Sequence, residues 1–315
     1  RRNATQFADV DGSPRTRSLA DNIRYFREGG QAGFETKRGC SMNCVYCAEP
    51  PSRGRRVRLR SPRLVADELK LLLDQGVDHF HTCDCEFNIP GDHAKAVCRA
   101  IIESGIADRI RWYAYCSITP FDDEMADLFK RAGCGGVDFG ADSGSDDMLR
   151  RLGRDFRSAD LANTAALCHK HGIPFMYDLL IGSPGETRET VRETIELMRT
   201  INADCVGLSM GVRLYQGTAT ANWVRSQGDI ATNPDVYGAK QDNPHFLQPV
   251  FYVSPDLGAD MVDIVRQHVA GDKRFFLPSQ EEVDSNYNYN DNTVLVRAIE
   301  NGARGAYWDI LRRMR

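Results

Sequence analysis

The chain has 315 residues, of which 42% are hydrophobic and 27% charged, and its formal net charge is -4. This apolar fraction is enough for a large core, which excludes a disordered or fibrous protein. The slightly acidic balance argues against a dedicated nucleic-acid or membrane-surface binder. No apolar run approaches the ~18 residues that cross a bilayer, and the first residues lack the apolar segment of a secretion signal. We therefore expect a soluble, cytoplasmic protein.

In chain order, residues 1–33 are polar and predict a leader or linker. From residue 34 onward, short apolar segments alternate with segments of helical spacing, which is typical of parallel βα units. The predicted strands are 34–39, 79–83, 111–116, 136–140, 174–181 and 205–212. The predicted helices are 61–76, 92–104, 122–133, 158–170, 187–201 and 260–269, with a further helix near Thr293.

Six such strands are fewer than the eight that close a full barrel. The sequence therefore predicts an α/β fold, a partial (β/α)6 TIM-type barrel, over residues 34–218. Residues 219–315 are predicted to form an α-rich C-terminal extension that closes the barrel and shapes the substrate pocket. Its aromatic side chains offer either stacking surfaces for an organic substrate or packing against the bottom of the barrel, and they include Tyr287, Tyr289, Tyr307 and Trp308.

Three of the ten cysteines, Cys40, Cys44 and Cys47, follow the first predicted strand with the spacing Cys-x3-Cys-x2-Cys. Three thiolates on one short loop can hold three corners of a four-iron cluster and leave the fourth iron open. An electron-transfer cluster or a structural zinc site normally has four protein ligands. The missing ligand favours a cluster that binds a substrate or cofactor directly. The alternative is a zinc site completed by a distant side chain, in a metal- or cluster-binding protein without turnover.

With Tyr46 just before the third cysteine, the loop resembles that of the radical S-adenosylmethionine (SAM) superfamily, and the resemblance covers residues 34–218. It implies that Cys40, Cys44 and Cys47 hold a [4Fe-4S] cluster whose fourth iron binds SAM. Members of the superfamily add one electron to SAM and cleave it, usually to methionine and a 5′-deoxyadenosyl radical that abstracts hydrogen from the substrate. The resemblance also implies a small-molecule substrate and a reductant such as a flavodoxin or ferredoxin.

Further motifs lie where predicted strands end, the edge at which such barrels carry their sites. Cys83-Asp84-Cys85-Glu86 keeps the acid of the family's Gly-Gly-Glu pattern without its glycines. The segment 140–144 matches Gly-x-Glu-Ser-Gly with Asp for Glu, and 182–187 matches Gly-x-Pro-Gly-Glu-Thr. The resemblance assigns cofactor binding to Tyr46, Glu86, Asp142, Ser143, Gly182, Pro184 and Arg213. The alternatives are a helix cap for Ser143, turn architecture for 182–187 and an ordinary surface position for Arg213.

The catalytic residue stays open, with Cys83, Cys85 and Tyr215 as candidates. A thiol beside the SAM site can donate a hydrogen atom or bind a thiophilic substrate, although small buried cysteines are the commoner case. We expect His79 and His81 to be buried and hydrogen-bonded rather than ligands. The remaining cysteines are expected in the core, and they are Cys98, Cys116, Cys134, Cys168 and Cys205.

The segments 35–40, 184–187 and 305–309 resemble the cobalamin-associated branch of the superfamily. Proteins of that branch usually carry an N-terminal B12-binding domain before a linker like residues 1–33, and many are methyltransferases. The resemblance therefore implies methyl transfer, with cobalamin as a further cofactor. No Asp-x-His-x-x-Gly motif occurs among the seven histidines, so a missing or diverged B12 domain and an enzyme without cobalamin both stay open. The alternative reactions are a cobalamin-free oxidation, a rearrangement or transfer of the aminocarboxypropyl arm of SAM.

Overall fold

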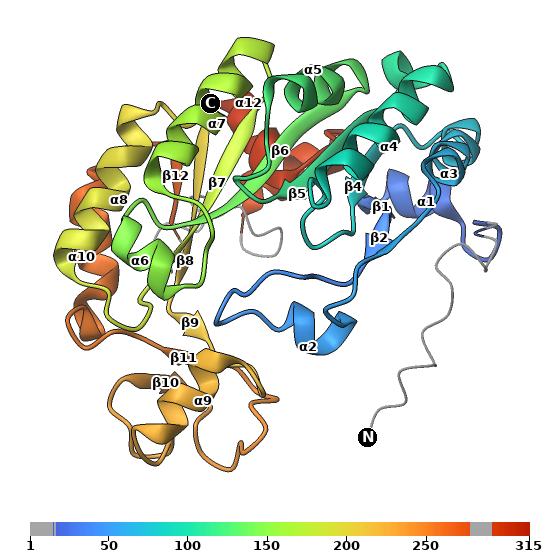
Figure 1. Ribbon diagram of the computed structural model, residues 1–315. Coiled ribbons are helices and arrows are strands. Elements are labelled where there is room, and N and C mark those ends of the chain that lie inside the picture. Colours follow the sequence, from blue (N-terminus) through green and yellow to red (C-terminus); the bar gives the residue numbers. More distant parts are fainter. Residues whose placement is uncertain (1–14, 16, 278–291) are drawn as a thin grey trace.

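The structure is a computed structural model that describes residues 15, 17–277 and 292–315. Its centre is a curved sheet with helices along the outer face (Figure 1). The strands of this sheet are β1 (Ala32–Phe34), β4 (His79–Thr82), β5 (Arg111–Cys116), β6 (Cys134–Asp142), β7 (Phe175–Ile181), β8 (Cys205–Met210) and β12 (Phe275–Phe276). Among the described residues the order is β1-β4-β5-β6-β7-β8-β12, and every neighbouring pair is parallel. The predicted α/β partial barrel is confirmed.

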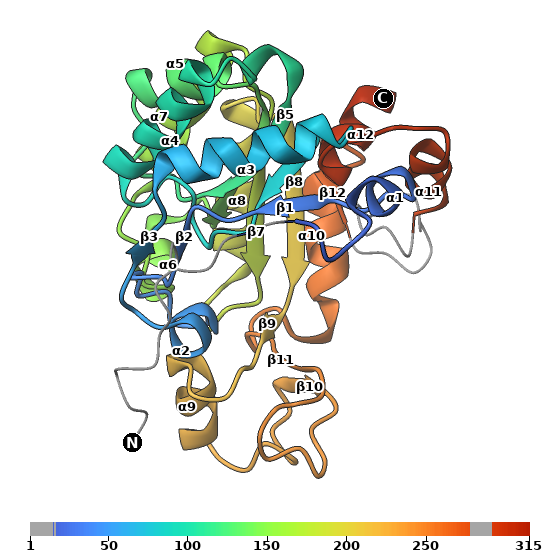
Figure 2. The ribbon, with the colours of Figure 1, turned by 90° about the vertical axis from the view of Figure 1, so that its right-hand side faces the viewer.

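Helices connect the strands, and α3 runs across the front of the view in Figure 2. The longer helices are α3 (Pro62–Asp74), α4 (Gly91–Glu103), α5 (Asp123–Arg131), α7 (Ser158–His171), α8 (Arg188–Thr200) and α10 (Met261–Val269). Each packs against a neighbour: α3 against α4, α4 against α5, α5 against α7, and α8 against α10. Shorter helices are α1 (Asn22–Arg27), α2 (Glu49–Arg53), η1 (Ala107–Arg109), α6 (Asp146–Arg151), α9 (Ala219–Ser226), η2 (Gly258–Asp260), α11 (Thr293–Glu300) and α12 (Tyr307–Met314).

Capping residues fix several helix ends where the sequence predicts them. The Asp122 carboxylate accepts a hydrogen bond from the backbone N–H of Met125, and the Thr187 hydroxyl accepts one from that of Thr190. Both bonds satisfy N–H groups that lack a partner within the first turn of a helix. Gly172 ends α7 with φ at 60°, a left-handed conformation that glycine adopts without strain.

The first strand differs from the prediction of 34–39. The chain leaves the main sheet after Phe34, because the backbone N–H groups of Thr36 and Lys37 donate to the buried Asp84 carboxylate instead of to a strand. The next residues form β2 (Lys37–Arg38), which pairs antiparallel with β3 (Arg58–Leu59). This small hairpin holds the two ends of the cysteine loop together.

The number of strands also differs, because six were predicted and the described sheet has seven. The seventh, β12, comes from the C-terminal third and pairs with β8 through Phe275 and Phe276. Two residues carry no readable alternation of apolar and polar side chains, so only their pairing identifies this strand. The C-terminal third therefore extends the barrel sheet itself.

Apolar side chains fill the outer and inner faces of the sheet separately. Trp112 and Phe129 belong to the outer core, between the sheet and the covering helices. On the inner face, Tyr113 meets the ring of Trp308 edge-on, and its hydroxyl donates to Asp309 at 2.8 Å. Helices α11 and α12 thus close the end of the barrel where the strands begin.

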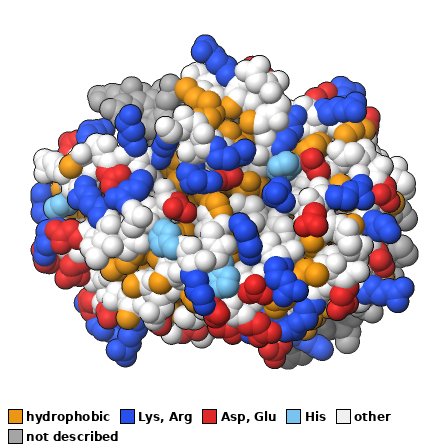
Figure 3. Space-filling model, turned by 90° about the horizontal axis from the view of Figure 1, so that it is seen from above, with side chains coloured by type: hydrophobic (Ala, Val, Ile, Leu, Met, Phe, Trp, Pro, Cys, Tyr) orange, Lys and Arg blue, Asp and Glu red, His pale blue; other side chains and the backbone are white. Residues whose placement is uncertain are grey.

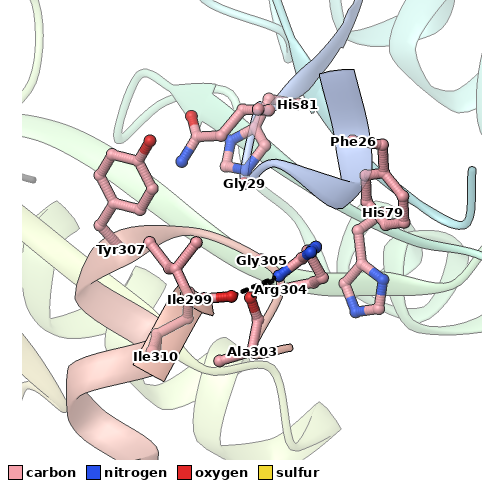
Figure 4. Close-up of a pocket in the computed structure, with 12 residues that line it drawn as sticks. Phe26, Gly29, His79, His81, Ile299, Ala303, Arg304, Gly305, Tyr307 and Ile310 are labelled. Atoms are coloured by element: carbon pink, nitrogen blue, oxygen red, sulfur yellow. Dashed lines mark hydrogen bonds between the residues drawn. The ribbon is translucent and has the colours of Figure 1, made fainter. Parts of the chain in front are cut away.

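A small cavity remains between this C-terminal plug and β4. Figure 4 shows His79 and His81 on one side and Ile299, Arg304 and Tyr307 on the other. Its volume is about 10 Å³, which is room for about one water molecule. Tyr307 and Trp308 therefore pack at the bottom of the barrel, whereas Tyr287 and Tyr289 lie outside the described residues.

A smaller unit follows β8 at the other end of the barrel. It consists of α9 and a three-stranded antiparallel sheet, whose strands are β9 (Val212–Arg213), β10 (Val236–Gly238) and β11 (Val250–Tyr252). A separate apolar cluster that includes Leu214, Val224 and Phe246 holds this unit together. The described helices are all too short or too polar to span a membrane. On the face seen in Figure 3, basic and acidic side chains are interspersed.

Candidate active site

The cysteine loop lies between β2 and β3, at the edge of the sheet where the strands end (Figure 1). Gly39 opens it with φ at 93°, and a Cβ atom there would lie 2.3 Å from the backbone oxygen of Arg56. The backbone N–H of Cys40 donates to the Gly54 oxygen at 3.0 Å. This tight approach requires glycine and brings Cys40, Cys44 and Cys47 together on one short loop.

Hydrogen-bond donors point at two of the three sulfur atoms. Nη1 of Arg154 lies 2.8 Å from Sγ of Cys44, and the backbone N–H of Glu49 lies 3.4 Å from Sγ of Cys47. Burial raises the pKa of Cys44 to about 11, while the Arg154 charge opposes that rise. Interaction with the neighbouring Cys85 thiol lowers the pKa of Cys40 to about 6. Such donors stabilise thiolates, the form in which cysteine ligates iron.

The donor set fits an iron–sulfur cluster. Three thiolates on one loop, with cationic and N–H donors beside them, match the chemistry of such a cluster. In the described part of the chain, no group of three His, Cys, Asp or Glu side chains is arranged to hold a metal ion. The loop residues are thus suited to a cluster.

Arg154, which follows α6, organises the polar groups behind this loop. The Arg154 side chain is buried, and its Nε lies 3.3 Å from Oδ2 of Asp142. The Tyr46 hydroxyl donates to the same oxygen at 2.7 Å, and Oε1 of Glu86 lies 3.9 Å from Nη2 of Arg154. Nη2 also donates to the backbone oxygen of Gly140. The structure therefore brings Tyr46, Glu86 and Asp142 to one cation.

Sequence reasoning missed Arg154, because none of the motifs matched in this sequence contains it. The only signal was an arginine shortly after an acidic helix start, and an exposed position explains such a residue equally well. In the folded protein the Arg154 side chain is buried, and its guanidinium carbon lies 4.9 Å from the centroid of the Phe156 ring.

Burial sets the ionisation of the two acids. It raises the pKa of Glu86 to about 7 and also raises that of Asp142, while the Arg154 charge opposes both shifts. Asp142 has φ at 60°, where the β6–β7 register shifts. A non-glycine residue in this conformation is uncommon, and such irregularities often redirect a side chain near a functional site.

Ser143 and the 182–187 motif form structural contacts. The Ser143 hydroxyl lies 3.0 Å from that of Thr194 and accepts a hydrogen bond from the N–H of Ser145, which caps α6. The buried Glu186 carboxylate accepts from the N–H of Gly182 at 2.5 Å and from that of Ser183 at 3.1 Å. These bonds favour cap and turn architecture for Ser143 and Gly182, whose cofactor roles stay predictions.

Pro184 lines a cavity of about 440 Å³ near the cysteine loop. Val45 of the loop and Trp223 of α9 also border it. Pro184 therefore faces open space beside the loop, and its role in cofactor binding likewise stays a prediction.

The remaining candidates lie in different surroundings. The Cys85 thiol donates to Oε2 of Glu49 at 3.2 Å and contacts Cys40, whereas Cys83 is exposed and packs over Gly33. Cys85 thus belongs to the cysteine loop's surroundings, and Cys83 lies beside β1. The five cysteines expected in the core are all buried, which confirms that prediction.

Arg213 lies in the small unit, on β9, where its side chain is half-buried. Its guanidinium carbon is 5.3 Å from the Tyr215 ring centroid and 5.6 Å from that of Phe251, and its Nε has no hydrogen-bond partner in the described part of the chain. Tyr215 is 42% exposed. The two predicted residues therefore contact each other at the carboxyl end of β8, apart from the Arg154 group as far as the described contacts show.

The comparisons with known proteins agree on one family. The sequence model of the Radical SAM superfamily matches residues 34–198. The chain belongs to this superfamily. Tryptophan 2-C-methyltransferase from Streptomyces laurentii, a relative, is 33% identical over 341 aligned residues, which cover 91% of this chain and 57% of that protein.

Two solved structures of another relative, the radical SAM methyltransferase TsrM from Kitasatospora setae, have similar folds. The structure with tryptophan and the SAM analogue aza-SAM bound aligns with a TM-score of 0.85 and 30% identity, over 98% of this chain and 64% of that one. The structure with cobalamin and a [4Fe-4S] cluster bound aligns with a TM-score of 0.81 and 29% identity, over 98% and 63% of the two chains. This chain thus spans less than two thirds of the length of these relatives.

Proposed function

We propose that this chain is the catalytic portion of a cobalamin-dependent radical SAM methyltransferase that acts on a small organic molecule, with tryptophan as the first candidate. One observation supports this above all: the three-cysteine loop lies directly against a buried group of Arg154, Tyr46, Asp142 and Glu86. The methyltransferase and tryptophan parts are supported by what the relatives are named for and by what the TsrM structures hold.

In this proposal Cys40, Cys44 and Cys47 hold a [4Fe-4S] cluster, which supplies the electron for SAM cleavage when bound. Arg154 offsets the negative charge of the thiolates and keeps Sγ of Cys44 hydrogen-bonded. Asp142, held by Tyr46, and Glu86 offer carboxylates to the polar end of SAM at the same edge of the barrel. The protein thus contributes ligation, orientation and charge balance, while the cofactors supply the difficult chemistry.

The predicted domain organisation remains part of the proposal. Residues 34–218 form the SAM barrel, and 219–315 form the extension that shapes the substrate pocket. The predicted linker 1–33 ends earlier than expected, because it already contains α1 and the start of β1, which pairs with β4. Cobalamin is supplied by a part of the protein outside this chain. Free thiols that must hold a cluster require a reducing compartment, which supports a cytoplasmic location and a flavodoxin or ferredoxin as reductant. We propose no nucleic-acid or membrane partner.

The proposal is tested by reconstituting the protein with iron and sulfide under anaerobic conditions, and then adding SAM, dithionite, tryptophan and methylcobalamin. Mass spectrometry identifies the products derived from SAM. S-adenosylhomocysteine together with methylated tryptophan supports the full proposal, and 5′-deoxyadenosine alone supports radical chemistry without methyl transfer. Methylthioadenosine indicates transfer of the aminocarboxypropyl arm. An intact cluster that gives no product from SAM in the full protein, with its cobalamin-binding part present, contradicts the enzymatic function.

A further inference from the structure

We propose that the inner face of the barrel binds a protonated amine through Asp138 of β6 and Asp178 of β7, and that the methyl acceptor carries this amine. The inference rests on the proposed function, because it names the chemical class of substrate that the same barrel accepts. The ligand chemistry is an ammonium group beside two carboxylates, away from the cluster thiolates.

The strand register places both acids on the inner face. Tyr115 is the β5 neighbour of Asp138, and Gly140 is the β6 neighbour of Asp178. Neighbours in a parallel pair point to the same side of a sheet, as do residues two apart in one strand. Tyr113, two residues before Tyr115, packs on Trp308 of the inner plug. Asp138 and Asp178 therefore lie beyond this plug, toward the carboxyl edge.

Asp138 has an unfilled hydrogen-bonding position. The residue is 5% exposed, and no described residue forms a hydrogen bond with its Oδ1. Its carboxylate accepts a hydrogen bond from the Tyr115 hydroxyl. A buried acceptor without a partner costs about 1–3 kcal/mol, so such atoms are rare and need an explanation. A donor brought by a ligand provides one.

The carboxylates around Asp138 also favour the binding of a cation there. Burial raises the pKa of Asp138 well above its usual range, and the nearby Asp178 and Glu86 carboxylates raise it further. No ion pair between described residues includes Asp138, since the nearby Arg154 pairs with Asp142 and Glu86. An ammonium group would supply the missing positive charge and the missing donor together.

The inner face is accessible and lies close to the proposed SAM site. Tyr115 is 46% exposed although it is in a central strand, and Ser209 of β8 is also exposed. Asp178 lies between Gly140 and Gly207, which have no side chains to fill the space beside it. A Cβ atom on Gly140 would lie 3.3 Å from Nη2 of Arg154, so the acids adjoin the group around that arginine. A molecule held there is next to the reaction.

Two sources can supply the ammonium group, the substrate and the amino group of SAM itself. The contacts favour the substrate, because Asp142 and Glu86 already surround Arg154 beside the cysteine loop. Asp138 and Asp178 lie earlier in β6 and β7, further from the carboxyl edge of the sheet. SAM affinity is therefore measured separately in the test below.

The test measures equilibrium binding of paired probes to the reconstituted protein with SAM present. One pair is tryptamine and indole-3-propionate, and the other is phenethylamine and 3-phenylpropionate; each pair shares a ring and differs in charge. We expect both amines to bind at least about tenfold more tightly than their carboxylate partners. The isosteric Asp138→Asn variant should lose that preference, mainly through weaker amine binding. Asp127→Asn, an exposed position on α5, is the matched control and should behave as wild type.

The outcomes separate this inference from the proposed function. An amine preference with the phenyl pair alone supports the amine site and rejects an indole substrate. No amine preference in either pair, or no probe binding at all, overturns the amine site, whatever products SAM gives. Unchanged amine binding in folded Asp138→Asn also overturns it, and so does a loss of SAM affinity without a loss of probe binding. Thermal unfolding confirms that the variant is folded.

Discussion

The two ends of the barrel differ in the side chains that line their inner face. Where the strands begin, Trp308 and Ile310 of α12 cover the inner face and pack in one apolar cluster with Tyr113 of β5. Where they end, the same strands present Asp138, Asp142 and other buried acids that apolar packing does not cover. Close packing stabilises the first end, whereas the second end keeps buried carboxylates, among them Asp138, whose Oδ1 has no hydrogen-bond partner among the described residues. The four predictions below test this division.

The largest effect should come from the cysteine loop. Cys44→Ala should reduce the iron content of the reconstituted protein and abolish SAM cleavage, because two thiolates cannot hold the cluster in place. Iron and sulfide analysis with mass spectrometry of SAM products measures this. The control is Cys98→Ala in the outer core, which should keep the iron content and the SAM cleavage of wild type. A Cys44→Ala protein that still cleaves SAM would refute the assignment of the loop.

At the opposite end, Trp308→Ala should cost about 3–5 kcal/mol of unfolding free energy, because it removes a large buried ring from the plug. SAM affinity should stay within about twofold in the folded variant, since the plug lies away from the carboxyl edge. Urea unfolding and calorimetry measure the two quantities. Met314→Ala, 52% exposed on α12, is the control. A Trp308→Ala protein that loses SAM binding without losing stability would contradict the view that the plug end serves stability and the carboxyl end serves binding.

Arg154→Ala should lower SAM cleavage about 10- to 100-fold, the usual cost of removing a group that orients metal ligands. It should also shift the reduction potential of the cluster to more negative values, since a donor to the Cys44 sulfur is lost. Redox titration monitored by EPR measures the potential, which a merely structural role would leave unchanged. The Arg154→Lys variant should have a reduction potential between those of wild type and Arg154→Ala. Arg150 is exposed on α6, so Arg150→Ala should leave the potential unchanged.

The last prediction concerns the pH dependence of stability and does not involve the reaction. Burial lowers the pKa of His81 to about 4, below its unfolded value of about 6.5. The unfolded chain therefore binds the proton first, and His81 should cost about 1.4 kcal/mol of stability per pH unit as pH falls from 6.5 to 4. Glu86 and Glu186, with pKa values raised to about 7, have the opposite slope between pH 4.5 and 7.

The difference between wild type and His81→Phe isolates the histidine term, because the two acids are common to both. Phenylalanine keeps a ring against Tyr113 but does not titrate. Urea unfolding at several pH values should show that the variant loses less stability than wild type between pH 6.5 and 4. Equal losses would mean that His81 is protonated in the folded protein as readily as in the unfolded one.

The sequence alone determined the local features of this protein. Hydrophobic periodicity and caps such as Asp122 and Thr187 predicted most helices and strands, because these signals depend on residues only a few positions apart. The cysteine spacing and the neighbouring motifs were enough to indicate the family for the same reason. The predicted end of the first strand was wrong. The Asp84 carboxylate, almost fifty residues away, accepts hydrogen bonds from the backbone N–H groups that follow Phe34.

Only the tertiary structure decided which distant residues share a site. Arg154 belongs to the candidate site because its side chain is buried beside Cys44, Asp142 and Glu86, which come from three other segments of the chain. Likewise β12 exists through its pairing with β8, and Asp138 shows an unmet hydrogen bond only once its neighbouring strands exclude water. Burial and pairing are properties of the folded chain, so periodicity and spacing cannot reveal them.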